Sequence, residues 1–138
     1  MESPWLEKMM FEDELKKPIS EMKFDDDYWF PEKPLIYISH PFLTNGNPEE
    51  NLANVSKILE ELVLKYKDKF IFISPIHNFG TLDGALNYDD GLKICMNLLK
   101  RCDGIIMCGD YTNSNGCMTE LKYAEQKRMR IWKLEDFK

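Results

Sequence analysis

Residues 102–124 read CDGIIMCGDYTNSNGCMTELKYA. The segment starts with a short apolar run, passes through a polar loop, and shows the beginning of a helix at Ser114 and Asn115. A strand that leads through a loop into a helix directs the free backbone N–H groups of that helix toward one point. Glu120 lies one and a half helical turns further on, so its carboxylate can face the same point. The stretch therefore predicts an anion-binding loop beside a carboxylate.

Buried strands and amphipathic helices alternate on both sides of this stretch. Four apolar runs predict strands apolar on both faces, as in a parallel sheet, at residues 35–39, 70–74, 104–108 and 130–134. Apolar residues spaced by three and four predict helices at residues 48–66, 90–102 and 115–128. This alternation predicts the α/β class: a three-layer Rossmann- or flavodoxin-like domain, with a mostly parallel sheet of four to five strands and helices on both faces.

The connections carry their own signals. Asn47 followed by Pro48 is typical of a helix start, with asparagine as the N-cap and proline in the first position. Asp89 or Asp90 can cap the next helix. Residues 76–88 predict the longest loop of the domain, placed where a lid would be expected.

Charge divides the chain into two parts. The 138 residues suffice for one domain with a real core. Residues 1–34 hold ten acids against five bases, and residues 35–138 hold fourteen against thirteen. We therefore expect an acidic, aromatic N-terminal arm and one α/β domain. Because the domain is almost neutral, a face that binds a nucleic-acid duplex is not expected.

The arm at residues 1–34 admits two interpretations. Its aromatic residues could pack on its own domain or on a neighbouring subunit. Alternatively, the arm could be a lid or a segment that binds a partner.

Composition limits the compartment and the cofactors. No apolar run approaches the roughly 18 residues of a membrane span, and the N-terminus does not resemble a signal peptide. The four cysteines form no C-x-x-C pair, so we expect free thiols in a cytoplasmic protein. With two histidines and no ligand spacing, neither a metal site nor a cofactor is expected.

Polar residues gather where the predicted strands end. In open parallel sheets the ligand binds outside the carboxyl ends of the strands. Three groups of residues fall there: Tyr37, Ser39 and His40 after the first strand; Ser74 and His77 after the second; and Asp110, Ser114, Asn115, Gly116 and Glu120 after the third. We expect these residues to form one site.

Several of these segments together resemble the nucleoside 2-deoxyribosyltransferase superfamily, particularly its small phage and bacterial members. Tyr-Ile-Ser lies in the first strand, Ser-Pro ends the second, and Cys-Asp-Gly-Ile-Ile begins the third. The pattern Ser-x-Gly-x-x-x-Glu-x-x-x-Ala follows, at Ser114, Gly116, Glu120 and Ala124. The resemblance covers about residues 35–134. It implies a homo-oligomer, a dimer or larger, in which a neighbour completes the site.

The resemblance also implies roles. Glu120 matches the nucleophile that attacks the anomeric carbon of a (deoxy)ribose, and Tyr37 matches the tyrosine that steadies it. Ser114 stands where transferases of free nucleosides keep a carboxylate and where hydrolases of nucleoside 5′-phosphates keep a serine. A hydroxyl beside helix N–H groups favours a phosphate, which a carboxylate would repel. The helix N-terminus should also keep Glu120 ionised.

One position departs from the superfamily pattern. Characterised members carry an aspartate, about two turns before the position of Asp103, that handles the leaving base. Cys95 stands there in this chain. Asp89, Asp90 or His77 could supply the proton instead. If none does, the pocket could bind without cleaving, or act on another leaving group.

We therefore expect cleavage or transfer at the N-glycosidic bond of a nucleoside 5′-phosphate. One alternative is a pocket that binds a nucleotide or ADP-ribose-like ligand without catalysis, and another is an interaction module in which the arm is the working part. The candidate residues also have structural explanations: Glu120 as a solvated first-turn glutamate, Tyr37 as a strand aromatic, and His40, His77, Asp103 and Asp110 as residues that stabilise loops.

Overall fold

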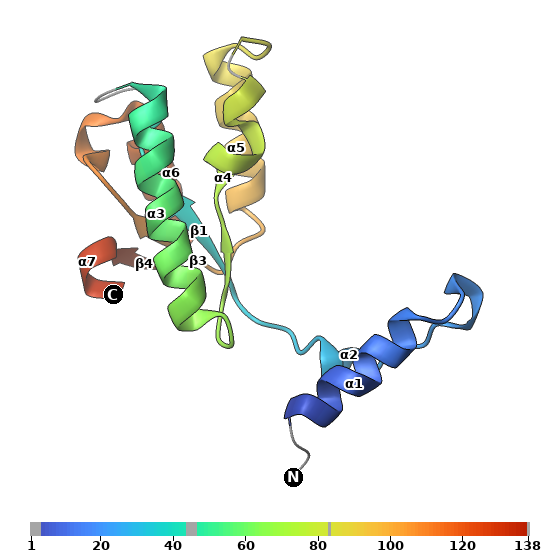
Figure 1. Ribbon diagram of the computed structural model, residues 1–138. Helices are drawn as coiled ribbons and strands as arrows, with labels where there is room; N and C mark the ends of the chain where they lie inside the picture. Colours follow the sequence, from blue (N-terminus) through green and yellow to red (C-terminus); the bar gives the residue numbers. More distant parts are fainter. Residues whose placement is uncertain (1–3, 44–46, 83, 138) are drawn as a thin grey trace. The chain divides into compact units, whose positions relative to one another are not determined.

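A computed structural model describes residues 4–43, 47–82 and 84–137 (Figure 1). The chain divides into two compact units, Met1–Glu32 and Lys33–Lys138. The larger unit contains the α/β domain expected from the sequence. The smaller unit corresponds to the acidic arm.

The α/β domain is built on a four-stranded sheet in which every strand is parallel to its neighbours. The strands are β1 (Leu35–Ser39), β2 (Ile71–Ile73), β3 (Gly104–Met107) and β4 (Arg130–Lys133). Their order across the sheet is β2-β1-β3-β4. The chain therefore leaves β1 toward one edge for β2 and returns to the other side of β1 for β3. The expectation of a Rossmann- or flavodoxin-like α/β fold is confirmed.

Helices cover both faces of this sheet and complete three layers (Figure 1). One face packs against α3 (Pro48–Tyr66) and α7 (Leu134–Phe137), through a core that includes Ile36, Ile38, Val55 and Leu62. The other face packs against α5 (Tyr88–Leu99) and α6 (Asn115–Gln126), through Leu99, Ile105, Met107 and Ala124. Because β1 and β3 are buried on both faces, their sequences are apolar without alternation.

The ends of the helices partly follow the sequence signals. Asn47 caps α3 as expected, since its side chain accepts a hydrogen bond from the Glu50 N–H at 2.7 Å. The expected cap of α5 by Asp89 or Asp90 is wrong: Asn87 caps that helix by accepting from the Asp90 N–H at 2.8 Å. The side-chain oxygen of asparagine accepts this N-cap hydrogen bond as readily as that of aspartate does.

The segment expected to be one long loop contains helical turns. α4 (Pro75–Phe79) and η2 (Gly80–Leu82) follow β2, and η3 (Tyr111–Asn113) lies between β3 and α6. Pro75 occupies the first turn of α4, where its fixed φ suits a helix and its missing N–H costs nothing. The segment after β2 is therefore helical over residues 75–82, and its apolar side chains have fixed positions on the α/β domain.

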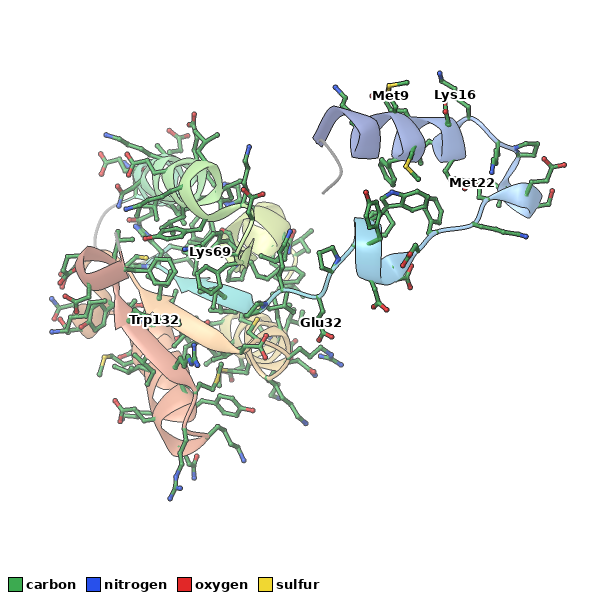
Figure 2. All side chains as sticks on the ribbon, turned by 90° about the horizontal axis from the view of Figure 1, so that it is seen from below. Met9, Lys16, Met22, Glu32, Lys69 and Trp132 are labelled. Atoms are coloured by element: carbon green, nitrogen blue, oxygen red, sulfur yellow. The ribbon has the colours of Figure 1, made fainter. Side chains whose placement is uncertain are left out.

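The N-terminal unit has an aromatic centre of its own. It comprises α1 (Pro4–Leu15), η1 (Ile19–Glu21) and α2 (Asp26–Trp29). The rings of Phe11, Phe24, Trp29 and Phe30 meet at centroid distances of 5.3 to 6.1 Å. Figure 2 shows ring-bearing side chains between the helical segments of this unit. The buried Glu14 carboxylate accepts from the Lys23 N–H at 2.9 Å, and this bond lowers the pKa of Glu14.

Candidate active site

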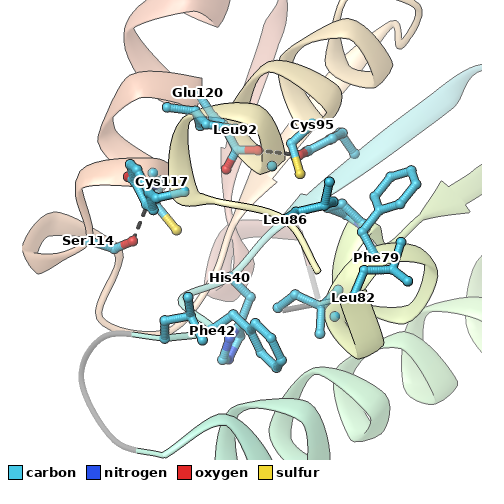
Figure 3. Close-up of a pocket in the computed structure, with 18 of the residues that line it drawn as sticks. His40, Phe42, Phe79, Leu82, Leu86, Leu92, Cys95, Ser114, Cys117 and Glu120 are labelled. Atoms are coloured by element: carbon cyan, nitrogen blue, oxygen red, sulfur yellow. Dashed lines mark hydrogen bonds between the residues drawn. The ribbon is translucent and has the colours of Figure 1, made fainter. Parts of the chain in front are cut away.

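A pocket of about 230 Å³ opens at the carboxyl ends of β1 and β3 (Figure 3). This is the point where the strand order reverses, and ligands bind at such points in open α/β sheets. The polar part of the lining comes from β1, the loop after it, α5 and α6. It consists of Tyr37, His40, Asn87, Tyr88, Ser114 and Glu120, with the thiols of Cys95 and Cys117 beside them.

Glu120 is held at the pocket by the first strand. The side chain is only 7% exposed, although it is a carboxylate. The Tyr37 hydroxyl donates to its Oε2, and the Ser39 hydroxyl donates to its Oε1 at 2.8 Å. Residues two apart on a strand share a face, so β1 presents both hydroxyls to α6. Both carboxylate oxygens are thus fixed in position, and the alternative of a solvated glutamate is excluded for this conformation.

Burial dominates the electrostatics of Glu120. Desolvation raises its pKa from the ordinary value of 4.5 to about 7, against the opposing effect of the bonds from Tyr37 and Ser39. The expectation that the helix N-terminus would keep this group ionised is therefore wrong near neutral pH. The macrodipole acts mainly within the first turn, whereas Glu120 is the sixth residue of α6.

Ser114 begins α6, as expected. Its Oγ accepts from the Cys117 N–H at 3.3 Å, which leaves the hydroxyl proton available to donate elsewhere. The first N–H groups of a helix have no partner within it, and those of Asn115 and Gly116 are at this end of α6. Ser114 and Gly116 line the pocket, with the Tyr88 hydroxyl near Gly116. An anionic group in the pocket would therefore meet the start of α6.

His40 supports the pocket and stays neutral. Its Nδ1–H donates to the Pro41 carbonyl at 2.6 Å, so its Nε2 accepts from the Asn54 amide at 2.8 Å. Burial lowers the pKa of His40. Asn51 also donates to the Phe42 carbonyl at 2.7 Å. Two asparagines of α3 thereby fix the loop that carries His40 and Phe42.

The comparison with known families bears on this same region. Residues 35–133 match the family described as "Domain of unknown function (DUF4406)". This chain belongs to that family. No curated protein matches it. The match includes every described residue of the pocket and excludes the N-terminal unit, so the pocket belongs to the DUF4406 domain.

Some residues expected at the site lie elsewhere in the DUF4406 domain. Ser74 and His77 are hydrogen-bonded to each other, at 2.6 Å from Oγ to Nδ1, and His77 Nε2 lies 2.9 Å from Ser56 Oγ. His77 is exposed and does not line the pocket. Asp110 accepts from the Asn113 amide at 2.7 Å and thereby stabilises its own turn.

The remaining expected residues have three different positions. Gly116 lines the pocket, Ser39 does not line it but donates a hydrogen bond to Glu120, and Asn115 is exposed and outside the lining. Asp89 and Asp90, considered as proton donors, are exposed on the first turn of α5 and do not line the pocket.

The described residues contain no cluster of three or more side chains suited to a metal ion. None of the helices they form is long and apolar enough to cross a membrane.

The sequence did not indicate the apolar wall of the pocket. Phe42, Phe79 and Leu82 lie across the cavity from Glu120 and Cys95, whereas Leu86 and Leu92 lie on the side of Cys95 (Figure 3). The other apolar lining residues are Leu43, Pro75 and Ile76. The three-residue spacing of Ile76 and Phe79 after Pro75 was the available signal of a short helix with one apolar face. The pocket therefore combines a polar side with an apolar one.

Cys95 lies beside the catalytic candidates. Its thiol interacts with the Tyr37 hydroxyl, and burial together with the charge of Glu120 raises its pKa. All four cysteines are free, and Cys102, Cys108 and Cys117 are buried.

Proposed function

We propose that this DUF4406 domain cleaves or transfers at the N-glycosidic bond of a nucleoside 5′-phosphate, with Glu120 as the nucleophile. The observation that carries the proposal is the buried carboxylate of Glu120, fixed by Tyr37 and Ser39 at the wall of a pocket. The resemblance to nucleoside 2-deoxyribosyltransferases supports the same assignment.

The arrangement suits this chemistry. Cleavage of a glycosidic bond passes through an oxocarbenium-like state, which a nearby carboxylate stabilises by charge or by forming a glycosyl ester. A nucleophile with a pKa of about 7 is a stronger base than an ordinary glutamate and is still ionised in part at neutral pH. The Tyr37 and Ser39 hydroxyls hold it in one orientation, which reduces the entropy lost on reaching the transition state.

The other end of the ligand is assigned to the start of α6. Ser114 and the first N–H groups of the helix offer donors to a 5′-phosphate, and the macrodipole favours its negative charge. The pocket volume of about 230 Å³ lies below the roughly 300–1,000 Å³ typical of small-molecule sites, which favours a mononucleotide over a dinucleotide.

A second candidate is binding without cleavage. It is favoured by Cys95, a thiol with a raised pKa at the position where the superfamily keeps its base-handling acid. The two candidates differ in their products, because only the first releases a free base. A homo-oligomer completing the site belongs to the proposal in either case and rests on the resemblance alone.

The test is incubation with a panel of nucleoside 5′-phosphates, followed by chromatography for free base. Wild type should release base, and Glu120→Gln should lower the rate at least ~10³-fold, as expected for loss of a nucleophile. Glu125→Gln makes the same change at an exposed position of α6 and should leave the rate unchanged. Tight binding of an intact ligand by wild type would support the second candidate instead.

A further inference from the structure

The pocket contains few groups that can give up a proton. Among the described lining residues, Glu120 is the one carboxylate, and no lysine or arginine is present. The other lining groups with an ionisable proton are His40, Cys95, Cys117, Tyr37 and Tyr88. Whether any of them could protonate a leaving base decides which glycosidic bonds the site can break.

His40 is the first candidate, and its hydrogen bonds exclude it. The single proton of its neutral ring is donated to the Pro41 carbonyl, and its other nitrogen is occupied by Asn54. Burial disfavours a second proton by lowering the pKa of the ring. The imidazole therefore fixes the loop and does not act as an acid.

The phenols and thiols are no better suited. The Tyr37 proton is donated to Glu120, and the pKa of this phenol is raised well above its ordinary value by burial and by the adjacent carboxylate. Burial likewise raises the pKa of Cys95, Cys117 and Tyr88. Efficient general acids have a pKa near the working pH, so none of these groups meets that requirement.

We propose that this site acts on N-glycosides whose base is already cationic, of the pyridinium type, and which leave as neutral rings without taking up a proton. The inference deepens the proposed function and rests on it. It names the substrate class: a ribose 5′-phosphate carrying a pyridinium-like ring. The reaction then needs a nucleophile and a binding surface for the ring, and it needs no acid.

The bonds and charges balance. The C1′–N bond breaks, its electron pair passes to the ring nitrogen, and the ring departs neutral. The ionised Glu120 forms a bond from one carboxylate oxygen to C1′. Water then attacks C1′, the glycosyl ester returns Glu120 to its carboxylate form, and one proton is released to solvent. Hydrolysis of a neutral-base nucleotide, by contrast, releases no net proton.

The two sides of the pocket suit such a ring. The apolar wall includes Phe42, Phe79 and Leu82, which can cover a flat aromatic surface (Figure 3). The opposite side holds the buried acid of Glu120, which has no lysine or arginine beside it among the described lining residues. A cationic ring supplies the missing positive charge, and its approach favours the ionised form that the reaction requires.

The test compares substrates that share ribose 5′-phosphate and differ in the base. Nicotinamide mononucleotide represents the cationic class, and AMP, UMP and CMP represent the neutral class. We expect wild type and Glu125→Gln to cleave nicotinamide mononucleotide with a kcat/KM at least ~100-fold above that for the neutral nucleotides, since general acid help is worth about that much. One proton should appear per ring released, and Glu120→Gln should abolish both signals.

The failures of the two proposals are distinguishable. Glu120-dependent cleavage of neutral nucleotides at equal or higher efficiency would overturn this inference and leave the proposed function standing. Absence of cleavage with every nucleotide would overturn both. Binding of nicotinamide mononucleotide without release of its ring would also count against the inference.

Introducing an acid provides an independent arm. Cys95→Asp places a carboxyl group at the pocket, whereas Cys95→Ser changes the thiol to a hydroxyl of similar size. The aspartate variant should improve cleavage of AMP relative to nicotinamide mononucleotide at least ~10-fold, and the serine variant should not. Thermal unfolding establishes that both variants are folded. An unchanged preference in a folded Cys95→Asp protein would contradict the inference.

Discussion

The carboxyl group of Glu120 is under two opposing influences. Burial favours its neutral form, and the hydroxyls of Tyr37 and Ser39 favour its ionised form. Because burial is the larger effect, both forms are populated near neutral pH. The resulting carboxylate is more basic than one on the surface, which is useful for a nucleophile.

This balance predicts how stability depends on pH. A folded-state pKa of about 7, raised from 4.5, means that Glu120 binds a proton on folding between these values. The stabilisation is therefore fully present below about pH 4.5 and is lost as the pH rises through 7, a change of about 3 kcal/mol. Urea unfolding at pH 5 and pH 8 measures the free energy of unfolding of Glu120→Gln relative to that of wild type. This difference should shift by about 2–3 kcal/mol in favour of the variant between pH 5 and pH 8.

Glu125→Gln is the control for this pH experiment, because Glu125 is exposed on the same helix. Its stability relative to wild type should stay constant between the two pH values. If Glu120→Gln also stayed at a constant difference from wild type, the carboxyl of Glu120 would not be the titrating group.

Individual site residues were predictable when a local pattern determined their positions. Glu120 and Ser114 followed from the spacing of one strand–loop–helix unit, and Tyr37 from its strand and the resemblance. The partners of His40 could not be predicted, because Asn54 contacts it only once α3 packs against the sheet. The suggested proton donors Asp89, Asp90 and His77 do not line the pocket, and this too depends on tertiary packing and could not be predicted from local patterns.

At the scale of elements, one aspartate joins the starts of two strands. Asp103 precedes β3, and its carboxylate accepts from the Leu35 N–H at 2.8 Å, while its own N–H donates to the Leu35 carbonyl at 2.8 Å. Asp103 therefore has a structural role, as expected, but it bonds the first residue of β1 and not a loop. At the end of the sheet opposite the pocket, the Asp103 side chain thus links β1 to the start of β3 in addition to the backbone hydrogen bonds.

Removing this carboxylate should weaken the sheet without changing the chemistry. Asp103→Ala should lower the free energy of unfolding by about 1 kcal/mol, because the Leu35 N–H loses a charged acceptor that is partly replaced by water. Asp68→Ala, a substitution in the turn before β2, is the comparison for loss of an exposed charge. Equal effects of the two substitutions in urea unfolding would show that the hydrogen bond from the Leu35 N–H to the Asp103 carboxylate does not contribute to stability.

The long helices and the strands were predicted from the sequence, whereas the shortest helices were not. Helices α3, α5 and α6 and the four strands follow from hydrophobic spacing over whole segments. α4 has five residues and η2 has three, so the single three-residue spacing from Ile76 to Phe79 was too short a pattern to predict a helix. Since these short helices contribute much of the apolar wall, that side of the pocket could not be predicted from the sequence.

At the scale of the whole molecule, the N-terminal unit was the least predictable part. Its sequence mixes acidic and aromatic residues without a clear period, and only the structure reveals that the rings of Phe11, Phe24, Trp29 and Phe30 pack on one another. A unit of 32 residues is below the size that usually folds alone without disulfides or metals. Many of its apolar side chains are exposed, among them Ile19 at 89%.

The two units therefore predict different behaviour on dissection. A chain of residues 33–138 keeps both cores of the α/β domain and all described pocket residues. We expect it to unfold cooperatively, with a Tm within a few degrees of the full chain, and to retain Glu120-dependent base release. Circular dichroism during heating and the chromatographic assay measure these properties. Loss of base release in a fragment that remains folded would instead assign residues 1–32 to the site, as a lid or as an arm that completes a neighbouring subunit.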